Sequence, residues 1–205
     1  ATKNTSGKIN EELWCQPTTM YGCNKLYCEQ LGRYYTKFYR QLAADKNPSG
    51  IDFRAIRFPG LISAITTPTG GTSDYGPEML HHAAMGKKYR CFVRPDTQLP
   101  FMVMPDAIKA LLELEKADQR NLSKLVYNVT SFNPSAQEFY DIVINAFPNA
   151  EITFEPDIAR QGIVDTWPAD VDDSAATTDW GWKPDYDQDR AFHEYLLPAV
   201  KARYV

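Results

Sequence analysis

The feature that most limits the possible fold is a helix–turn–strand succession in the first third of the sequence. A helix is predicted over residues 19–43, a turn over 46–50 and a strand over 51–58. Pro59 and Gly60 are expected to end that strand. A helix that leads through a short turn into a strand is half of a parallel βαβ unit. Open α/β sheets bind ligands at the carboxyl ends of such strands, so the succession also indicates where a site would lie.

The predicted first helix carries an apolar stripe. Its members recur at spacings of four, three and four residues: Leu31, Tyr35, Phe38 and Leu42. This spacing puts them on one face of a helix, and we expect that face to be buried.

Helices and strands alternate through the rest of the chain, after a Thr- and Gly-rich connection over 61–76. Runs of β-forming residues predict four more strands, at 89–93, 100–104, 125–129 and 151–154. Helical periodicity predicts further helices, at 74–84, from 106 onward, and at 134–147, 158–166, 174–180 and 189–202. In the second of these, Asp106 is expected to cap the helix, and three residues are expected to face inward: Ile108, Leu111 and Leu112.

The composition argues against several classes of partner. The 205 residues carry a net charge of −4 and contain no block of Lys and Arg, which disfavours nucleic acid and anionic membranes. A small metabolite or a protein is the expected partner. The four cysteines show no Cys-x-x-Cys pair, and no apolar run is long enough to cross a membrane. We therefore expect free thiols in the cytoplasm, or in the mitochondrial matrix if the organism is eukaryotic.

No metal site is expected from the sequence. His81 and His82 are adjacent, and neighbouring residues on a helix face different ways. The acidic residues Asp170, Asp172 and Asp173 lack the spacing of a calcium-binding loop. A helix N-terminus, whose dipole favours negative charge, explains them better.

Tyr21 and Lys25 form the chief catalytic candidate. Residues four apart on a helix point the same way, so a phenol and an ammonium would lie side by side. The ammonium favours the phenolate and makes the phenol a usable general base near neutral pH. Such a pair can take a proton from an alcohol while a hydride leaves its carbon. The alternative is an amphipathic helix with one packed aromatic and one solvated lysine.

The motifs around this pair resemble those of a known superfamily. Tyr21-Gly22-x-x-Lys25, followed by Arg57-Phe58-Pro59-Gly60, resembles the extended short-chain dehydrogenase/reductases. Later segments are similar to the epimerase-like L-threonine 3-dehydrogenases within that superfamily. They are Gly-Gly-Thr-Ser-Asp-Tyr at 70–75, Leu-Pro-Phe-Met-Val-Met-Pro-Asp-Ala-Ile at 99–108, Arg-Gln with Trp-Pro over 160–168, Asp-Asp-Ser-Ala at 172–175 and Asp-Trp-Gly-Trp at 179–182.

The resemblance implies an α/β fold: the later part of a Rossmann-like doubly wound parallel sheet, with a small C-terminal α/β substrate-binding domain. Residues 1–60 would form the second half of the dinucleotide-binding domain, with strand and helix contributed by 97–130. Residues 61–96 and 131–205 would form the substrate-binding domain. The family's Gly-x-x-Gly-x-x-Gly phosphate loop has no counterpart here. The chain therefore resembles the C-terminal three-fifths of such an enzyme, without the glycine-rich cofactor half.

The resemblance also implies roles for the residues that match the family's cofactor and proton-transfer motifs. Tyr21 would be the general base for the 3-hydroxyl of L-threonine, and Lys25 would assist it and bind the nicotinamide ribose. Pro59 and Gly60 would lie beside the nicotinamide of NAD. A catalytic Ser or Thr of the family is expected upstream of the chain, and none is assigned here.

For the substrate, the resemblance implies contacts from Gly71 and Thr72, with Trp167 closing over the site. Thr72 could instead cap a helix, and Trp167 could be a packing residue. The implied reaction is oxidation of L-threonine to 2-amino-3-oxobutanoate with transfer of a hydride to NAD. The chain by itself would be inactive. Family members commonly form homodimers through a bundle that includes the Tyr/Lys helix.

Two other functions remain open from the sequence. One is a nucleotide-sugar epimerase or dehydratase of the same superfamily. Against it, Pro59 stands where those enzymes usually have an asparagine, and no arginine cluster for a diphosphate is apparent. The other is a non-catalytic fragment that binds a partner through an exposed sheet edge.

Overall fold

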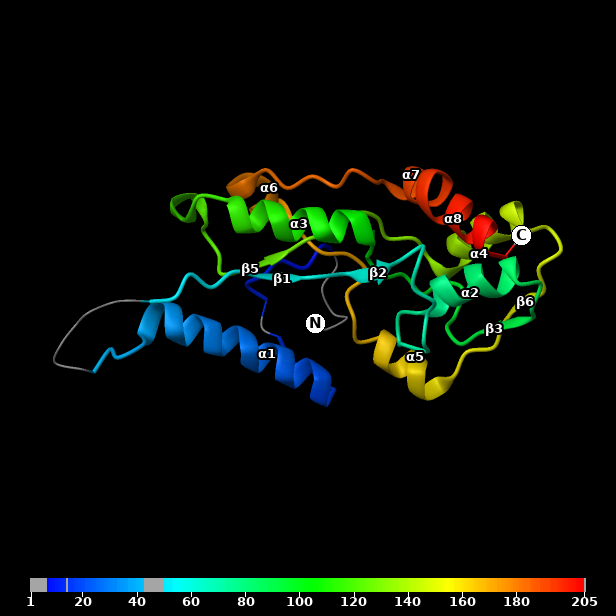
Figure 1. Ribbon diagram of the computed structural model, residues 1–205. Coiled ribbons are helices and arrows are strands. Elements are labelled where there is room, and N and C mark those ends of the chain that lie inside the picture. Colours follow the sequence, from blue (N-terminus) through cyan, green and yellow to red (C-terminus); the bar gives the residue numbers. More distant parts are fainter. Residues whose placement is uncertain (1–6, 14, 43–49, 205) are drawn as a thin grey trace.

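A computed structural model describes residues 7–13, 15–42 and 50–204 of the chain. Six short strands pair in parallel (Figure 1), which confirms the expected parallel α/β fold. The pairs are β1 (Ala55–Arg57) with β5 (Val126–Asn128), β2 (Gly60–Ile62) with β4 (Phe101–Val103), and β3 (Tyr89–Cys91) with β6 (Ile152–Phe154).

Helices flank these strands on both sides. In Figure 1, α1 and α3 lie on opposite sides of β1 and β5, and α2, α4 and α8 gather near β3 and β6. The helices are α1 (Met20–Arg33) with a π-helical extension η1 (Tyr34–Phe38), α2 (Tyr75–Ala84), α3 (Met104–Lys116), a 3₁₀ turn η2 (Gln119–Asn121), α4 (Ala136–Ala146), α5 (Ile158–Val164), α6 (Ser174–Trp180), and a last helix made of α7 (Gln188–Arg190), π-helical η3 (Ala191–Leu196) and α8 (Leu197–Tyr204). In the described part of the chain, no helix is both long and apolar enough to span a bilayer.

The chain changes pairing partner between β1 and β2. Arg57 is in register with Asn128 of β5, whereas Gly60 is in register with Phe101 of β4. Pro59 lies between them and has no N–H to donate to a ladder, which suits the point where one pairing ends. The predicted strand does end before Pro59 and Gly60, because β1 ends at Arg57. The sequence missed β2, which Gly60 begins at the start of the predicted connection, and the Gly60 N–H donates to the Pro100 carbonyl at 3.0 Å.

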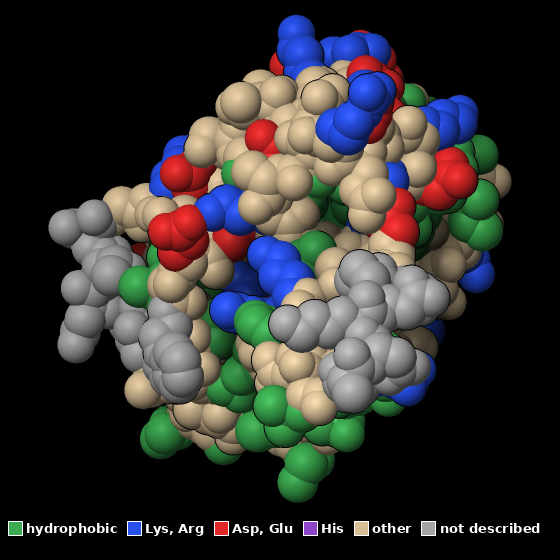
Figure 2. Space-filling model, turned by 90° about the vertical axis from the view of Figure 1, so that its left-hand side faces the viewer, with side chains coloured by type: hydrophobic (Ala, Val, Ile, Leu, Met, Phe, Trp, Pro, Cys, Tyr) green, Lys and Arg blue, Asp and Glu red, His purple; other side chains and the backbone are tan. Residues whose placement is uncertain are grey.

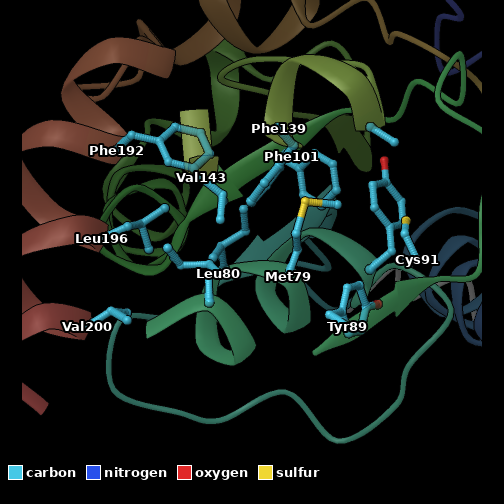
Figure 3. Packing of buried hydrophobic residues seen from close by; sticks show 14 of the residues in the cluster. Met79, Leu80, Tyr89, Cys91, Phe101, Phe139, Val143, Phe192, Leu196 and Val200 are labelled. Carbon is cyan, nitrogen blue, oxygen red and sulfur yellow. The ribbon is translucent and has the colours of Figure 1, made fainter. Parts of the chain in front are cut away.

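The larger hydrophobic core lies between α2, α4 and the last helix (Figure 3). The Phe139 ring of α4 meets the Phe192 ring of η3 edge-on, with 4.8 Å between centroids. The residues labelled in the figure include Met79 and Leu80 of α2, Phe139 and Val143 of α4, and Phe192, Leu196 and Val200 of the last helix. This core therefore packs together helices that lie more than a hundred residues apart in the sequence.

A smaller core lies between α3 and β5, and it corrects the predicted inward face of α3. The inward residues of this helix are Ala107, Ala110 and Leu114. The three residues that were expected there are each 52% exposed: Ile108, Leu111 and Leu112. Both sets fit helical spacing, and the small alanines let the helix lie close to Met102 and Tyr127 of the strands below.

The predicted buried stripe of α1 is also wrong. Its four members are all exposed: Leu31, Tyr35, Phe38 and Leu42. Only Gly32 of α1 is buried, and a Cβ built on it would lie 2.4 Å from the Phe53 ring. The helix therefore approaches the rest of the chain along the face of Gly32. Most of the predicted turn over 46–50 lies outside the described residues.

Candidate active site

The Tyr21–Lys25 pair lies at the start of α1. The Thr19 hydroxyl caps this helix by accepting a hydrogen bond from the Gly22 N–H at 3.1 Å. A Cβ at position 22 would lie 2.8 Å from that of Pro17, so the tight entry into the helix requires a glycine. The Lys25 ammonium lies 5.2 Å from the centroid of the Tyr21 ring. The tyrosine is 73% exposed, so its hydroxyl is open to a ligand.

Pro59 and Gly60 lie at the carboxyl end of β1, where open α/β sheets present ligands. The Gly60 N–H already donates to Pro100, so it is not available to a cofactor. A Cβ on Gly60 would lie 2.7 Å from the Phe101 ring, so the glycine also has a packing reason to be there.

Gly71 and Thr72 belong to a tight turn that leads into α2. The Asp74 carboxylate closes this turn by accepting hydrogen bonds from the N–H groups of Thr69 at 3.1 Å and Gly71 at 2.8 Å. Gly70 has a φ of +90°, a conformation that side chains rarely adopt. Asp74 occupies the N-cap position of α2 without capping it. Thr72 is half-buried between the turn and the helix.

The Arg160 side chain holds the same turn from α5. Its guanidinium donates to the carbonyls of Gly70 at 3.2 Å and Gly71 at 3.1 Å. The same group lies 3.2 Å from the centroid of the Phe92 ring. Sequence reasoning used Arg160 only as part of a motif and gave it no role. The only signal was the Arg-Gln motif, because the glycine carbonyls that Arg160 binds lie about ninety residues away.

Trp167 follows the end of α5 and is 36% exposed. Its N–H donates to the Val164 carbonyl at 2.9 Å, which fixes the loop to the helix. The residue lines a cavity of about 420 Å³ together with Arg94, Asp165 and Asp170. This position at a cavity wall agrees with a residue that covers a site.

A polar network fastens α5 beside this cavity. The buried Gln161 accepts from the Arg94 N–H at 2.8 Å and donates to the Thr97 hydroxyl at 3.1 Å. Arg94 donates two hydrogen bonds to the Asp165 carboxylate, at 2.9 and 3.1 Å. These bonds raise the pKa of the Arg94 guanidinium. The sequence gave no separate signal for this network.

The structure brings some of the predicted residues together and leaves others apart. Arg160 at one end of α5 contacts Gly71, and Trp167 follows the other end. Among the described residues, no hydrogen bond or ring contact joins Tyr21 or Lys25 to Gly71, Thr72 or Trp167. In Figure 1, α1 and α5 both lie below the strands, on the side opposite α3.

A second cavity, of about 690 Å³, lies between α1 and a segment that includes residues 11–13 and Cys15. Figure 2 shows Lys and Arg side chains gathered in a hollow on one face of the molecule. Four basic residues line this cavity, Arg33, Lys37, Arg57 and Lys124, and the last two are paired with carboxylates. Arg57 donates two hydrogen bonds to Glu29, at 2.9 and 2.7 Å, which raises the pKa of Arg57, and Lys124 binds Glu12.

No protein-family model matches the chain. Among curated proteins, it is 39% identical over 172 residues to the mitochondrial L-threonine 3-dehydrogenase of Bos taurus, covering 84% of this chain and 43% of the relative. An uncharacterized epimerase/dehydratase of Staphylococcus haemolyticus is 36% identical over 190 residues, covering 92% of this chain and 56% of that protein.

Solved structures extend the likeness to the fold. A monomeric L-threonine 3-dehydrogenase from a metagenome superposes with a TM-score of 0.86 at 35% identity, covering all of this chain and 61% of that one. A GalE-like L-threonine dehydrogenase from Cupriavidus necator gives a TM-score of 0.83 at 35% identity, covering 98% of this chain and 67% of that one. The chain belongs to the GalE-like L-threonine 3-dehydrogenases. As a member of that family it has a Rossmann-like fold, as expected from its motifs.

The family likeness is partial in length. The chain spans less than half of the bovine protein and about three-fifths of the metagenome enzyme.

Proposed function

We propose that this chain is the tyrosine-bearing part of an NAD-dependent L-threonine 3-dehydrogenase, which converts L-threonine to 2-amino-3-oxobutanoate. The observation that carries the proposal is the exposed phenol of Tyr21 with the Lys25 ammonium 5.2 Å from its ring. The family membership supports the choice of substrate, because the curated and structural relatives include L-threonine dehydrogenases. On its own, without further segments, the chain is proposed to be inactive.

In this proposal Tyr21 is the general base. Its phenolate oxygen takes the proton of the threonine 3-hydroxyl as the carbon–hydrogen bond at C3 breaks. Lys25 holds the phenolate by its positive charge, and the Thr19 cap keeps the first turn of α1, and with it this pair, in place. Bound NAD would accept the hydride.

The residues present fit one end of NAD. Lys25 is exposed and offers an ammonium with three donors to ribose hydroxyls, in reach of the same solvent face as Tyr21. Pro59 and Gly60 lie at the carboxyl end of β1 and would contact the nicotinamide through their surface, since the Gly60 N–H is already bonded. No glycine-rich phosphate loop follows a strand in this chain, so its residues would hold the nicotinamide end alone.

Gly71, Thr72 and Trp167 are proposed to bind the substrate. The Thr72 hydroxyl can donate to a carboxylate or accept from an ammonium, both of which an amino acid carries. The indole of Trp167 would exclude water above the bound molecule. We also propose that residues 1–60 and 97–130 belong to the dinucleotide-binding domain, and that residues 61–96 and 131–205 form the substrate-binding domain.

The exposed face of α1 is proposed to form a homodimer, as a helix with so many exposed aromatic residues requires cover. Those residues are Tyr27 of α1, Tyr34, Tyr35 and Phe38 of its extension η1, and Tyr39, which follows η1. The reaction is proposed to take place in the cytoplasm, or in the mitochondrial matrix of a eukaryote.

The test is NADH formation by the full-length protein. Tyr21→Phe should lower turnover of L-threonine by about 10²–10⁴-fold, because general-base catalysis contributes that much. Tyr27→Phe is the matched control: it removes a phenolic hydroxyl from another exposed position of the same helix and should leave turnover unchanged. Circular dichroism should be the same for all three proteins.

The alternatives predict other outcomes. Turnover of a UDP-sugar without NADH formation from L-threonine would make the protein an epimerase or dehydratase. Equal activity of Tyr21→Phe and Tyr27→Phe would remove Tyr21 from the reaction. No activity with any of these substrates, together with a partner that co-purifies, would support a non-catalytic role.

A further inference from the structure

The guanidinium of Arg160 makes three contacts with segments that are distant in the sequence. It donates to the carbonyls of Gly70 and Gly71, and it stacks on the ring of Phe92. A planar guanidinium can stack by its face and donate from its edge at the same time. The edge of the Arg160 guanidinium therefore binds the glycine turn, and its face packs on Phe92, which follows the end of β3.

The turn that Arg160 holds has little other support on its outer side. Its N–H groups are held from within by Asp74, whereas the carbonyls of Gly70 and Gly71 accept from Arg160. Both glycines are exposed. With Arg160 removed, the Gly70 carbonyl would turn to water, whereas the Gly71 carbonyl would keep only the bond that it accepts from the Asp74 N–H at 3.1 Å. The turn would lose its link to α5, and the position of Thr72 would be less well defined.

The helix that carries Arg160 is attached mainly by polar contacts. Of the seven residues of α5, only Gln161 and Val164 are buried, and Ile158 is 91% exposed. The Gln161 amide, in the middle of this helix, bonds to Arg94 and Thr97, and it also bonds to Asp165 at the C-terminal end of the helix. Trp167 continues directly from that end through its bond to Val164. The position of the Thr72 turn and of the Trp167 loop is thus set by one short helix.

We propose that Arg160 is a positioning residue for the substrate: it locks the Gly70–Gly71 turn to α5, so that Thr72 and Trp167 are held in one fixed relation around the amino acid. This rests on the proposed function of Thr72 and Trp167. Arg160 does not touch the reacting atoms in this arrangement. Its effect passes through the two glycine carbonyls.

The experiment compares three variants of the full-length protein. Arg160→Met keeps the aliphatic stem and removes all donors, and Arg160→Lys keeps a charge but loses the planar fork. Arg90→Met is the matched control, since Arg90 is an exposed arginine on β3 that pairs with the exposed Glu155 at 3.5 Å. We expect Arg160→Met to raise the KM for L-threonine about tenfold, the weight of one hydrogen bond to a charged group. Arg160→Lys should lie between, and the KM for NAD should stay unchanged in all three.

Amide hydrogen exchange gives a second readout that does not need activity. Exchange at residues 69–74 should be faster in Arg160→Met than in the unmodified protein and unchanged in Arg90→Met. An L-threonine KM that rises equally in Arg160→Met and Arg90→Met, or a rise that is equal for NAD, would overturn the proposal. If the unmodified protein does not oxidise L-threonine, the proposed function fails, and unchanged exchange at 69–74 then decides against Arg160 separately.

Discussion

A Cβ atom on Gly60 would lie 2.7 Å from the ring of Phe101, closer than such contacts occur in proteins. The two residues are in register in the parallel β2–β4 pair, and the Phe101 side chain is buried. The glycine that the family motif assigns to the nicotinamide is therefore also required by the sheet. A loss of activity at this position can come from packing alone.

Gly60→Ala should lower the free energy of unfolding by about 1–3 kcal/mol, because the methyl group overpacks the site against Phe101. Phe101→Leu should also destabilise, by leaving a cavity. The double variant should lose less than the sum, with a coupling of about 0.5–3 kcal/mol. Urea unfolding of the four proteins measures this, and strictly additive losses would show that the contact with Phe101 is not the cause.

Thr72→Val replaces the hydroxyl by a methyl group of the same shape. We expect the KM for L-threonine to rise about three- to tenfold, since one neutral hydrogen bond is lost. Thr69→Val is the control, because Thr69 lies on the same turn with an exposed side chain and takes part through its N–H. Steady-state kinetics decide the point, and an equal effect of both variants would assign the loss to the turn and not to the hydroxyl.

Asp106→Ala should lower the free energy of unfolding by about 3 kcal/mol. The Asp106 carboxylate is buried and accepts from the N–H groups of Asp185 at 2.9 Å and Tyr186 at 3.1 Å, and a hydrogen bond to a charged group contributes about 1.5–3 kcal/mol. Asp185→Asn, which weakens the partly exposed pair with Lys109, should cost about 0–1 kcal/mol. Thermal or urea unfolding distinguishes the two, and similar losses would contradict this account.

The role of Asp106 could not be predicted from the sequence. Asp106 was expected at the helix cap, but α3 begins at Met104, and the carboxylate bonds to a segment some eighty residues later. Helices that begin with a local sequence signal were predicted more accurately. Ser135 and Glu138 form a reciprocal capping box, and α4 lies within the predicted helix at 134–147. Local signals set where helices begin, whereas the partner of a buried carboxylate depends on the whole fold.

Inward faces could not be predicted for α1 and α3 for a related reason. Each helix has more than one apolar stripe at helical spacing, and the face that is buried is set by its neighbour. For α1 the neighbour is Phe53, which leaves room only for Gly32. For α3 the small side chains of Ala107 and Ala110 face the strands. Large apolar residues were the natural expectation, and both helices bury small ones.

For the candidate site, the motifs were sufficient for the local pairs. Tyr21 and Lys25 lie together because they are four residues apart on one helix, and this spacing can be counted in the sequence. The contacts of Arg160 could not be counted in this way, because they join positions about ninety residues apart. Roles that depend on distant partners therefore entered only with the structure.

The last prediction concerns pH and His81. This histidine is 2% exposed, and its Nδ1 lies 3.0 Å from the Tyr204 hydroxyl. Burial lowers the pKa of His81 below its ordinary value, and the charges of Arg203 and His82 lower it further. As the pH falls below about 6.5, His81 becomes protonated in the unfolded chain, while in the folded chain it stays neutral until a lower pH. The free energy of unfolding should therefore fall as the pH drops from about 6.5 toward the lower pKa that His81 has in the folded protein.

Urea unfolding at pH values from 5 to 8 measures this loss, but carboxylates elsewhere also lose stability on acidification. The comparison that isolates His81 is His81→Gln, which keeps a polar partner for Tyr204 and cannot titrate. Its free energy of unfolding should fall less steeply between pH 7 and 5 than that of the unmodified protein. His193→Gln, at an exposed position, should follow the unmodified protein. Parallel curves for all three would mean that His81 takes up its proton equally well in both states.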